Sequence, residues 1–403
     1  ITAVSRASSP YAAPPSRFAG VVNVREHGAL CNGVTDDFRA LTRAAVAAGA
    51  GGRVIVPACA SFYPVSSAWS ITQEGITVIG AGKNSMIVAT GTNNAIEITG
   101  AHGFSISDIA VGGVTGSGHG IVLGSVASPA HRGRVSNVFC RSVGGNCLEV
   151  VRSIITVVIQ PRFTGNESNP FTFTGSGGTA QKGINIQGSS LNNAMTILHP
   201  AIEGFATHGV DVASPTETLY IYGGSIEGNG HGSGLATNAN VRFAGSRQLI
   251  IDGTYMEVVD GGTNLHRQII ISGSFGSVLR GVIASALGVA PRGSIEIINS
   301  AGTRIENGVV DSITIDANST RTVLSGVSYG HNGGTITDNG TRTVKEFLHN
   351  ASNSHLQVGG SGTNAYINFG ENASFEQWDT NALLPAWLAY ASAANPTLLR
   401  TGT

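Results

Sequence analysis

The chain has 403 residues, of which 56 are glycine, and only 12% of its residues are charged. Glycine is used at roughly twice the frequency of an ordinary globular protein, and charged residues at about half. The formal net charge of −1 gives no electrostatic basis for binding nucleic acid or an anionic membrane. The sequence has no apolar run of about 18 residues, which argues against membrane insertion.

The first 20 residues, "ITAVSRASSPYAAPPSRFAG", are rich in serine, proline and alanine. They lack the apolar segment of a signal peptide. We interpret residues 1–20 as a linker or a truncated start.

A helix is predicted in "TDDFRALTRAAVAAGAGG". Phe38, Leu41 and Ala45 share one face at helical spacing. Thr35 is the expected N-cap, and the glycine-rich run 49–52 ends the helix. The strand "RVIVP" follows. The repeats described in the next paragraph predict a solenoid, and the open end of a solenoid exposes apolar side chains and strand edges. We therefore expect this helix to cover the first coil.

Three segments of the chain align without gaps: "MTILHPAIE" (Met195–Glu203), "LYIYGGSIE" (Leu219–Glu227) and "LIIDGTYME" (Leu249–Glu257). Apolar residues occupy the first, third and eighth positions of each, and glutamate the ninth. The period of two indicates strands, and the starts are 24 and 30 residues apart, about one solenoid turn.

These repeats predict an all-β, single-stranded parallel β-helix over residues 66–344, with inward residues stacked in columns. Ile197, Ile221 and Ile251 should then be neighbours on successive coils. Two sandwiches in tandem would also supply many strands. They would not explain the equal offsets inside the repeated segments.

The four cysteines leave two interpretations open. Cys140 and Cys147 flank "RSVGGN" and can pair across a turn, while Cys31 and Cys59 both lie near the start of the fold. Free cysteines buried in the core are the alternative. No Cys/His spacing matches a zinc site, and we expect neither a metal nor another cofactor.

The stretch "VVNVREHGALCNGVTDDFRALTRAAVAAGAGGRVIVPACASFYPV", Val21–Val65, resembles the N-terminal motif of the pectate-lyase-like right-handed β-helix superfamily. The similarity is specific in "GVTDD", in the helix spacing and in "GGRVIVP". The sequence departs from the family pattern at Cys31–Asn32 and at Ala58–Ala60. Phage tailspike depolymerases, polysaccharide lyases, glycoside hydrolases and inulin fructotransferases all carry this motif.

The resemblance implies a cap and first coil at residues 21–65 and an extracellular setting, on a virion tail or secreted. Residues 345–403 break the coil rhythm. They resemble the short C-terminal pieces of tailspikes, which serve trimerisation or sugar contact; a simple C-terminal cap is the alternative. We therefore expect a homotrimer with a polysaccharide substrate.

The candidate catalytic residues are Glu203, Glu227 and Glu257, at the ninth position of the three repeats. Side chains alternate along a strand, so all three should point outward and form a vertical ladder with rungs about 4.8 Å apart. Neighbouring carboxylates raise each other's pKa, and paired carboxylates are what glycoside hydrolysis needs. Adjacent rungs match a retaining mechanism and alternate rungs an inverting one, so both stay open.

Candidate sugar-binding residues surround these glutamates in the sequence. Tyr220, Tyr222 and Tyr255 are expected to point outward and to stack on sugar rings. His208 and His231 follow a ladder glutamate by four or five residues and are expected in the turns.

Three other functions remain open from sequence. A lyase would eliminate across a uronic-acid polymer with basic residues, for which Lys182, Arg242 and Arg267 are candidates. A fructotransferase resembling the inulin-acting family would also use paired carboxylates. A receptor-binding spike would bind an oligosaccharide without cleaving it.

Overall fold

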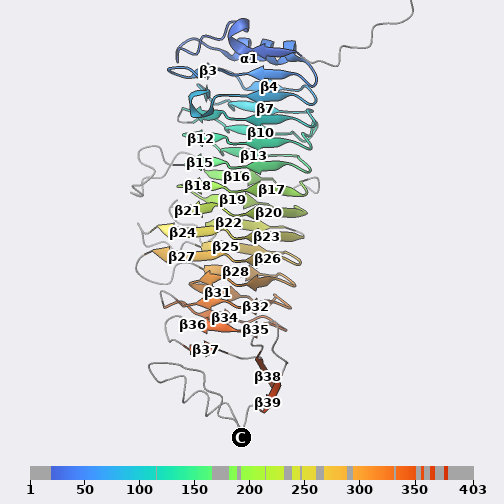
Figure 1. Ribbon diagram of the computed structural model, residues 1–403, viewed down its shortest axis with the longest axis vertical. Helices are drawn as coiled ribbons and strands as arrows, with labels where there is room; N and C mark the ends of the chain where they lie inside the picture. The colour runs from blue at the N-terminus through green and yellow to red at the C-terminus, as the bar shows by residue number, and fades with distance from the viewer. Residues whose placement is uncertain are drawn as a thin grey trace, which may run out of the picture.

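The structure is a computed structural model. It describes residues 20–114, 116–165, 181–187, 192–213, 215–230, 238–245, 247–259, 267–287, 294–330 and 333–350, and three short strands beyond them. Coil after coil stacks along one long axis, from the N-terminal end to the C-terminal end (Figure 1). The predicted parallel β-helix is confirmed.

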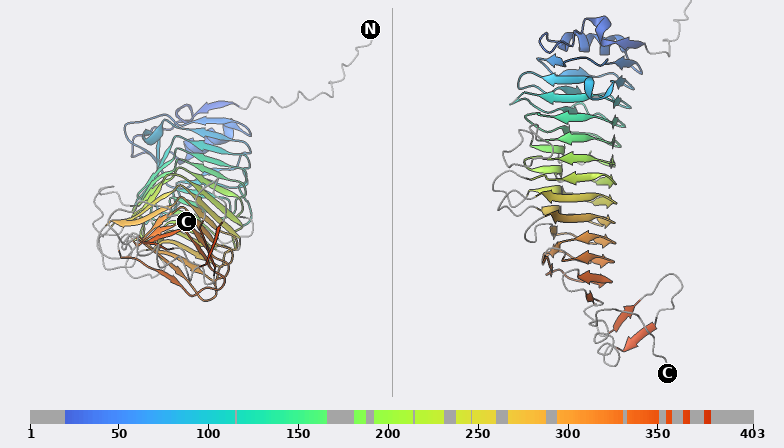
Figure 2. Two further views of the ribbon diagram at one scale, coloured as in Figure 1. Left: turned by 60° about the horizontal axis from the view of Figure 1, so that its bottom comes forward. Right: turned by 60° about the vertical axis from the view of Figure 1, so that its left-hand side comes forward.

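Three sheets, here called A, B and C, form the walls of the β-helix, and each coil passes from sheet A to sheet B to sheet C. All pairings within the coils are parallel, and each strand pairs with its equivalents one coil above and one coil below. Figure 2 shows the resulting stack from two further directions.

Sheet A has 13 strands: β1 (Val21–Asn23), β2 (Arg53–Ile55), β5 (Thr77–Ile79), β8 (Ser105–Ser107), β11 (Arg134–Ser136), β14 (Val157–Ile159), β17 (Met195–Leu198), β20 (Thr218–Tyr222), β23 (Gln248–Asp252), β26 (Val278–Arg280), β29 (Arg304–Glu306), β32 (Val323–Ser325) and β35 (Val344–Glu346).

Sheet B also has 13 strands: β3 (Tyr63–Val65), β6 (Met86–Ala89), β9 (Ala110–Gly113), β12 (Phe139–Arg141), β15 (Arg162–Thr164), β18 (Ala201–Glu203), β21 (Ser225–Glu227), β24 (Tyr255–Val259), β27 (Ile283–Leu287), β30 (Val309–Val310), β33 (Ser328–Tyr329), β36 (Leu348–Asn350) and β37 (His355–Gln357).

Sheet C has 11 strands: β4 (Trp69–Ile71), β7 (Ile96–Ile98), β10 (Ile121–Leu123), β13 (Leu148–Val150), β16 (Lys182–Ile186), β19 (His208–Val212), β22 (Ala239–Ala244), β25 (Arg267–Ser272), β28 (Ser294–Ile298), β31 (Ser312–Ile315) and β34 (Ile336–Asp338).

The core consists of inward columns of aliphatic side chains. Ile197, Ile221 and Ile251 are register partners on β17, β20 and β23, and all three are fully buried. The predicted stacking of these isoleucines is therefore confirmed. Each column gains from burying the same kind of side chain on every coil, which is why the apolar offsets repeat in the sequence.

The corner between sheets A and B is a two-residue connection that uses a left-handed backbone conformation. His199 takes this conformation on one coil (φ 48°) and Gly223 on the next (φ 61°). A Cβ atom at Gly223 would lie 2.7 Å from the His199 ring, so any other residue would displace that ring, and the left-handed backbone also favours glycine. The repeated corner fixes where each sheet B strand starts, and with it the register of the glutamates.

The helix α1 (Phe38–Ala48) covers the first coils and packs against β1, β2 and β4, with Leu41 and Ala45 buried. It begins after Asp37, so the expected cap at Thr35 is wrong. Asp37 is turned away from the helix because its carboxylate accepts the backbone N–H groups of Leu30 and Cys31, at 2.7 and 3.0 Å. Gly49 ends the helix as expected.

Of the two interpretations left open for the cysteines, the structure shows pairing, and both candidate pairs are disulfides. Cys31 is bonded to Cys59 in the cap, with Cα atoms 6.1 Å apart, and Cys140 to Cys147 in one coil, with Cα atoms 5.7 Å apart. Each cross-link closes a loop and restricts the unfolded chain.

The last parallel pairs in sheets A and B are β32 with β35 and β33 with β36. After them the pairing becomes antiparallel, between β36 and β37 and between β38 (Asn364–Ile367) and β39 (Glu376–Asp379). A capping, trimerisation or sugar-contact role for this region stays a prediction. In the described part of the chain, no helix is long and apolar enough to cross a membrane.

Candidate functional site

The carboxylate ladder consists of Glu203, Glu227 and Glu257, at equivalent positions of β18, β21 and β24. Glu227 is the register partner of Glu203 on one side and of Glu257 on the other. Their register was predicted correctly. The uncharged residues Thr164 and Ser285 occupy the next rungs above and below, so the negative charge is confined to three coils.

The two outer rungs of the ladder have different surroundings. Burial and the negative charge of Glu227 raise the pKa of the Glu203 carboxyl above its usual range. Glu257 is only 7% exposed, and its carboxylate accepts a hydrogen bond of 2.5 Å from the Tyr255 hydroxyl. The ladder thus combines a carboxyl group with a raised pKa and a carboxyl group that accepts a hydrogen bond from a tyrosine hydroxyl.

Tyr255 lies beside the ladder as predicted, because its side chain is on the same face of β24 as Glu257. Burial raises the pKa of its hydroxyl, and the nearby charges of Glu257 and Glu227 raise it further. The raised pKa favours the protonated hydroxyl, which donates the hydrogen bond to Glu257.

Tyr220 and Tyr222 are not beside the ladder. They project from the outer face of β20 in sheet A, with ring centroids 6.2 Å apart, whereas the glutamates lie on sheet B. The corner at Gly223 and Gly224 separates Tyr222 from Ser225, so the simple alternation assumed from sequence is broken there.

His208 is a strand residue, not a turn residue as expected. It begins β19, is buried, and accepts the backbone N–H of Ala239 at its Nδ1 atom, at 3.1 Å. Burial lowers the pKa of its imidazole to about 4. The ring is therefore neutral near pH 7. His231 lies outside the described residues.

A second group of charges, the Asp211 cluster, lies on the outer face of sheet C and comprises Lys182, His208, Asp211 and Arg242. Asp211 is fully buried, and the Lys182 Nζ atom lies 2.6 Å from its carboxylate. The Arg242 guanidinium donates two hydrogen bonds to the same carboxylate, of 2.6 and 2.9 Å. Despite burial, which opposes ionisation, the hydrogen bonds from Arg242 and the positive charges nearby lower the pKa of Asp211.

The basic residues considered for a lyase are all paired with carboxylates. Lys182 and Arg242 share Asp211, and Arg267 forms an ion pair with Glu296. A carboxylate partner stabilises the protonated form of a base. These pairs do not favour any of the three as the residue that removes a proton from a sugar.

Sequence reasoning did not identify Asp211 and Glu296, because the partners of each pair are 29 to 31 residues apart and belong to no shared motif. Of these pairs, Asp211 and Arg242 are register partners, so an alignment of the coils would have found them, whereas Arg267 is in register with Ser294 and not with Glu296. Within the described ranges, no three His, Cys, Asp or Glu residues group as metal ligands.

No family model matches the chain, and no curated protein matches it in sequence. Solved structures match it in fold. The catalytic unit of a thermostable GH87 α-1,3-glucanase from Streptomyces thermodiastaticus strain HF3-3 is 16% identical, with a TM-score of 0.53; the match covers 83% of this chain and 70% of the glucanase.

Two further structures have similar scores. An alginate lyase from Paenibacillus sp. str. FPU-7 is 13% identical with a TM-score of 0.52, and the match covers 80% of this chain and 100% of the lyase. The pre-mature gene product 12 of bacteriophage phi29 is 13% identical with a TM-score of 0.54; the match covers 81% of this chain but only 52% of the phage protein. At these identities the likeness shows the fold. The chain shares the parallel β-helix of a glucanase, an alginate lyase and a phage protein.

Proposed function

We propose that the protein is an extracellular polysaccharide-degrading enzyme, a glycoside hydrolase whose catalytic groups are the carboxylate ladder. The observation that carries this proposal is the register of Glu203, Glu227 and Glu257 on adjacent coils. Placing like charges on neighbouring strands destabilises a sheet. Serine, threonine or asparagine at these positions would avoid this repulsion, and the chain uses such uncharged residues widely elsewhere. The three glutamates therefore favour a functional role.

In the proposed mechanism Glu203 is the general acid, because its raised pKa favours the protonated form from which the leaving oxygen takes a proton. Glu227, one rung away, is the nucleophile. Adjacent rungs lie about 4.8 Å apart, close to the roughly 5–5.5 Å between the carboxyl groups of retaining enzymes. Tyr255 and Glu257 support Glu227 from the next rung, where the tyrosine hydroxyl keeps the third carboxylate fixed.

The comparisons support a polysaccharide substrate, since two of the similar structures are a glucanase and an alginate lyase. They do not favour hydrolysis over elimination. The ion pairs of Lys182, Arg242 and Arg267 favour hydrolysis, because they engage the three residues considered as the base of a lyase.

The experiment incubates the protein with capsular and extracellular polysaccharides and analyses the products by mass and ultraviolet absorbance. Hydrolysis adds one water per cleaved bond and produces no new absorbance. Elimination, by contrast, leaves an unsaturated, absorbing sugar and would contradict the proposal. NMR of the first product should show that the configuration at the anomeric carbon is retained. An inverted configuration would instead indicate Glu257, two rungs from Glu203, as the second catalytic carboxylate in place of Glu227.

A further inference from the structure

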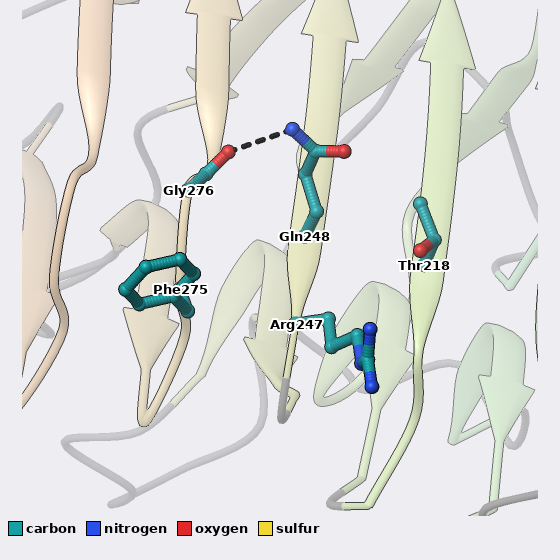
Figure 3. A pocket seen from close by; sticks show the side chains of 5 residues that line it. All are labelled: Thr218, Arg247, Gln248, Phe275 and Gly276. Carbon is teal, nitrogen blue, oxygen red and sulfur yellow. Dashed lines mark hydrogen bonds between the residues drawn. The ribbon is translucent and has the colours of Figure 1, made fainter.

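A pocket of about 460 Å³ opens at the corner where each coil passes from sheet C to sheet A. Its lining comes from three successive coils: Thr218, Arg247, Gln248, Phe275 and Gly276. Figure 3 shows Phe275 and Arg247 on either side of the strand that carries Gln248. The volume lies within the range of roughly 300–1,000 Å³ that is typical of small-ligand sites.

The side chains of this pocket combine an aromatic face with polar groups. Phe275 is 64% exposed, unusually so for a phenylalanine. Gln248 donates its amide hydrogen to the Gly276 carbonyl at 2.8 Å, which fixes the amide and directs its oxygen towards the Thr218 side (Figure 3). Arg247 forms an ion pair with Glu217, so its positive charge is balanced.

The outer face of β20 extends from Thr218, which lines the pocket, to the two tyrosines that lie away from the ladder. Thr218, Tyr220 and Tyr222 alternate along one strand and therefore share its outer face. The tyrosine rings are nearly parallel, with an interplanar angle of 6°. Phe275, Thr218, Tyr220 and Tyr222 thus lie on one continuous surface, which we call the sheet A surface.

We propose that the sheet A surface is a second carbohydrate-binding site, which holds neutral sugar units of the polysaccharide away from the carboxylate ladder. Aromatic faces pack on the apolar faces of sugar rings, while amide and hydroxyl groups meet the sugar hydroxyls. The balanced charge of Arg247 favours a neutral sugar over an acidic one. The ligand class rests on the proposed function, but the binding itself does not require cleavage.

A second copy of the chain is a less suitable occupant. A stable protein interface buries about 800 Å² on each partner and has an apolar centre. Beside Tyr220 this surface carries Ile250 and Val278, and its two ends carry Gln248 on one side and Asp252 and Arg280 on the other, which pair with each other at 3.6 Å. The polar residues at both ends of the surface suit a hydrated sugar better than a dry protein contact.

The test is affinity electrophoresis in native gels containing dextran, laminarin, pullulan or alginate, with Glu227→Gln as the background so that the ladder does not consume the probe. Phe275→Ala and Tyr220→Ala should each weaken binding to a neutral glucan about tenfold. Ile155→Ala, another exposed apolar residue at a corner of the β-helix, is the matched control and should migrate like the background. Alginate, an acidic polymer, should not bind the sheet A surface, so the background protein, Phe275→Ala and Tyr220→Ala should all migrate alike in gels that contain alginate.

Phe275→Ala should also raise the KM for the long polymer while hydrolysis of a short oligosaccharide and the melting temperature stay unchanged. Unchanged migration of both variants, or no retardation of the background protein by any neutral glucan, would overturn the proposal. A change of oligomeric state in Phe275→Ala would also overturn it, because the surface would then be a subunit contact. Failure of the proposed function is a separate result, seen as full activity in Glu227→Gln.

Discussion

Glu203 and Glu257 occupy equivalent positions two coils apart, yet their surroundings differ. Glu203 has a carboxylate neighbour and no hydroxyl donor among the described residues, and its pKa is raised by burial and by Glu227. Glu257 has the Tyr255 hydroxyl as a donor. The difference arises from one residue, because the place of Tyr255 is taken by serine on the Glu227 coil and by alanine on the Glu203 coil.

The raised pKa of Glu203 predicts how stability depends on pH. Above the ordinary glutamate value of 4.5, the unfolded chain loses this proton before the folded protein does. The folded state then binds more protons, so the contribution of Glu203 to stability falls as pH rises through its folded pKa. Glu203→Gln cannot ionise.

Melting temperatures of the wild type and Glu203→Gln, measured from pH 4 to about pH 8, should therefore diverge, with the variant gaining relative to the wild type at higher pH. Glu74→Gln, an exposed glutamate near the N-terminal end, is the control and should follow the wild type. Parallel curves for wild type and Glu203→Gln would show that the pKa of Glu203 is not raised.

At the scale of the strand, the sequence was sufficient to predict which residues of successive coils are register partners. It was not sufficient to predict which sheet carries each outward side chain. Equal offsets predicted correctly that Ile197, Ile221 and Ile251 stack and that the glutamates align. They did not predict that Tyr222 and Glu227 lie on different sheets, because a two-residue corner turns the chain without disturbing the offsets. Contacts between coils that lack a shared motif, such as Arg242 with Asp211, depend on loop lengths that the pattern does not contain.

The Asp211 cluster is predicted to stabilise sheet C rather than to take part in the reaction. Asp211→Asn removes the buried carboxylate and leaves Lys182 and Arg242 facing each other, which should cost about 3 kcal/mol in the free energy of unfolding. Asp252→Asn, which removes an exposed ion pair with Arg280, should cost less than about 1 kcal/mol.

Chemical denaturation of the two variants measures both values, and the specific activity of the folded Asp211→Asn protein should remain near that of the wild type. Equal stability of Asp211→Asn and wild type would contradict the structural role. A folded but inactive Asp211→Asn variant would place the cluster in the active site.

At the scale of the whole molecule, each coil covers the apolar side chains and strand edges of the next. A solenoid of this kind is stabilised by stacking and needs few charged residues. Parallel pairing satisfies the backbone groups inside the stack, and the helix α1 covers its first coils. The fold and its N-terminal cap were predictable because they repeat or carry a motif. The state of assembly was not, since side-by-side packing leaves no period in the sequence.

The expectation of a homotrimer stays a prediction and rests on the resemblance of the sequence to tailspikes. Sedimentation equilibrium at micromolar concentration should give three times the chain mass of 41.1 kDa. Removal of residues 351–403 should lower the mass to that of a monomer if this region drives assembly. A monomeric full chain would remove the trimer from the account while leaving the carboxylate ladder untouched.

The central claim is that Glu227 is a catalytic carboxylate, and its most direct test is the rate of polysaccharide cleavage by Glu227→Gln. This substitution keeps the shape of the side chain and removes the ionisable group. Loss of an essential carboxylate should lower the rate by several orders of magnitude without lowering the melting temperature, whereas the Glu74→Gln control should keep the wild-type rate. A Glu227→Gln variant that keeps more than about a tenth of the wild-type rate, a loss of less than ~1.4 kcal/mol in barrier, would contradict the account.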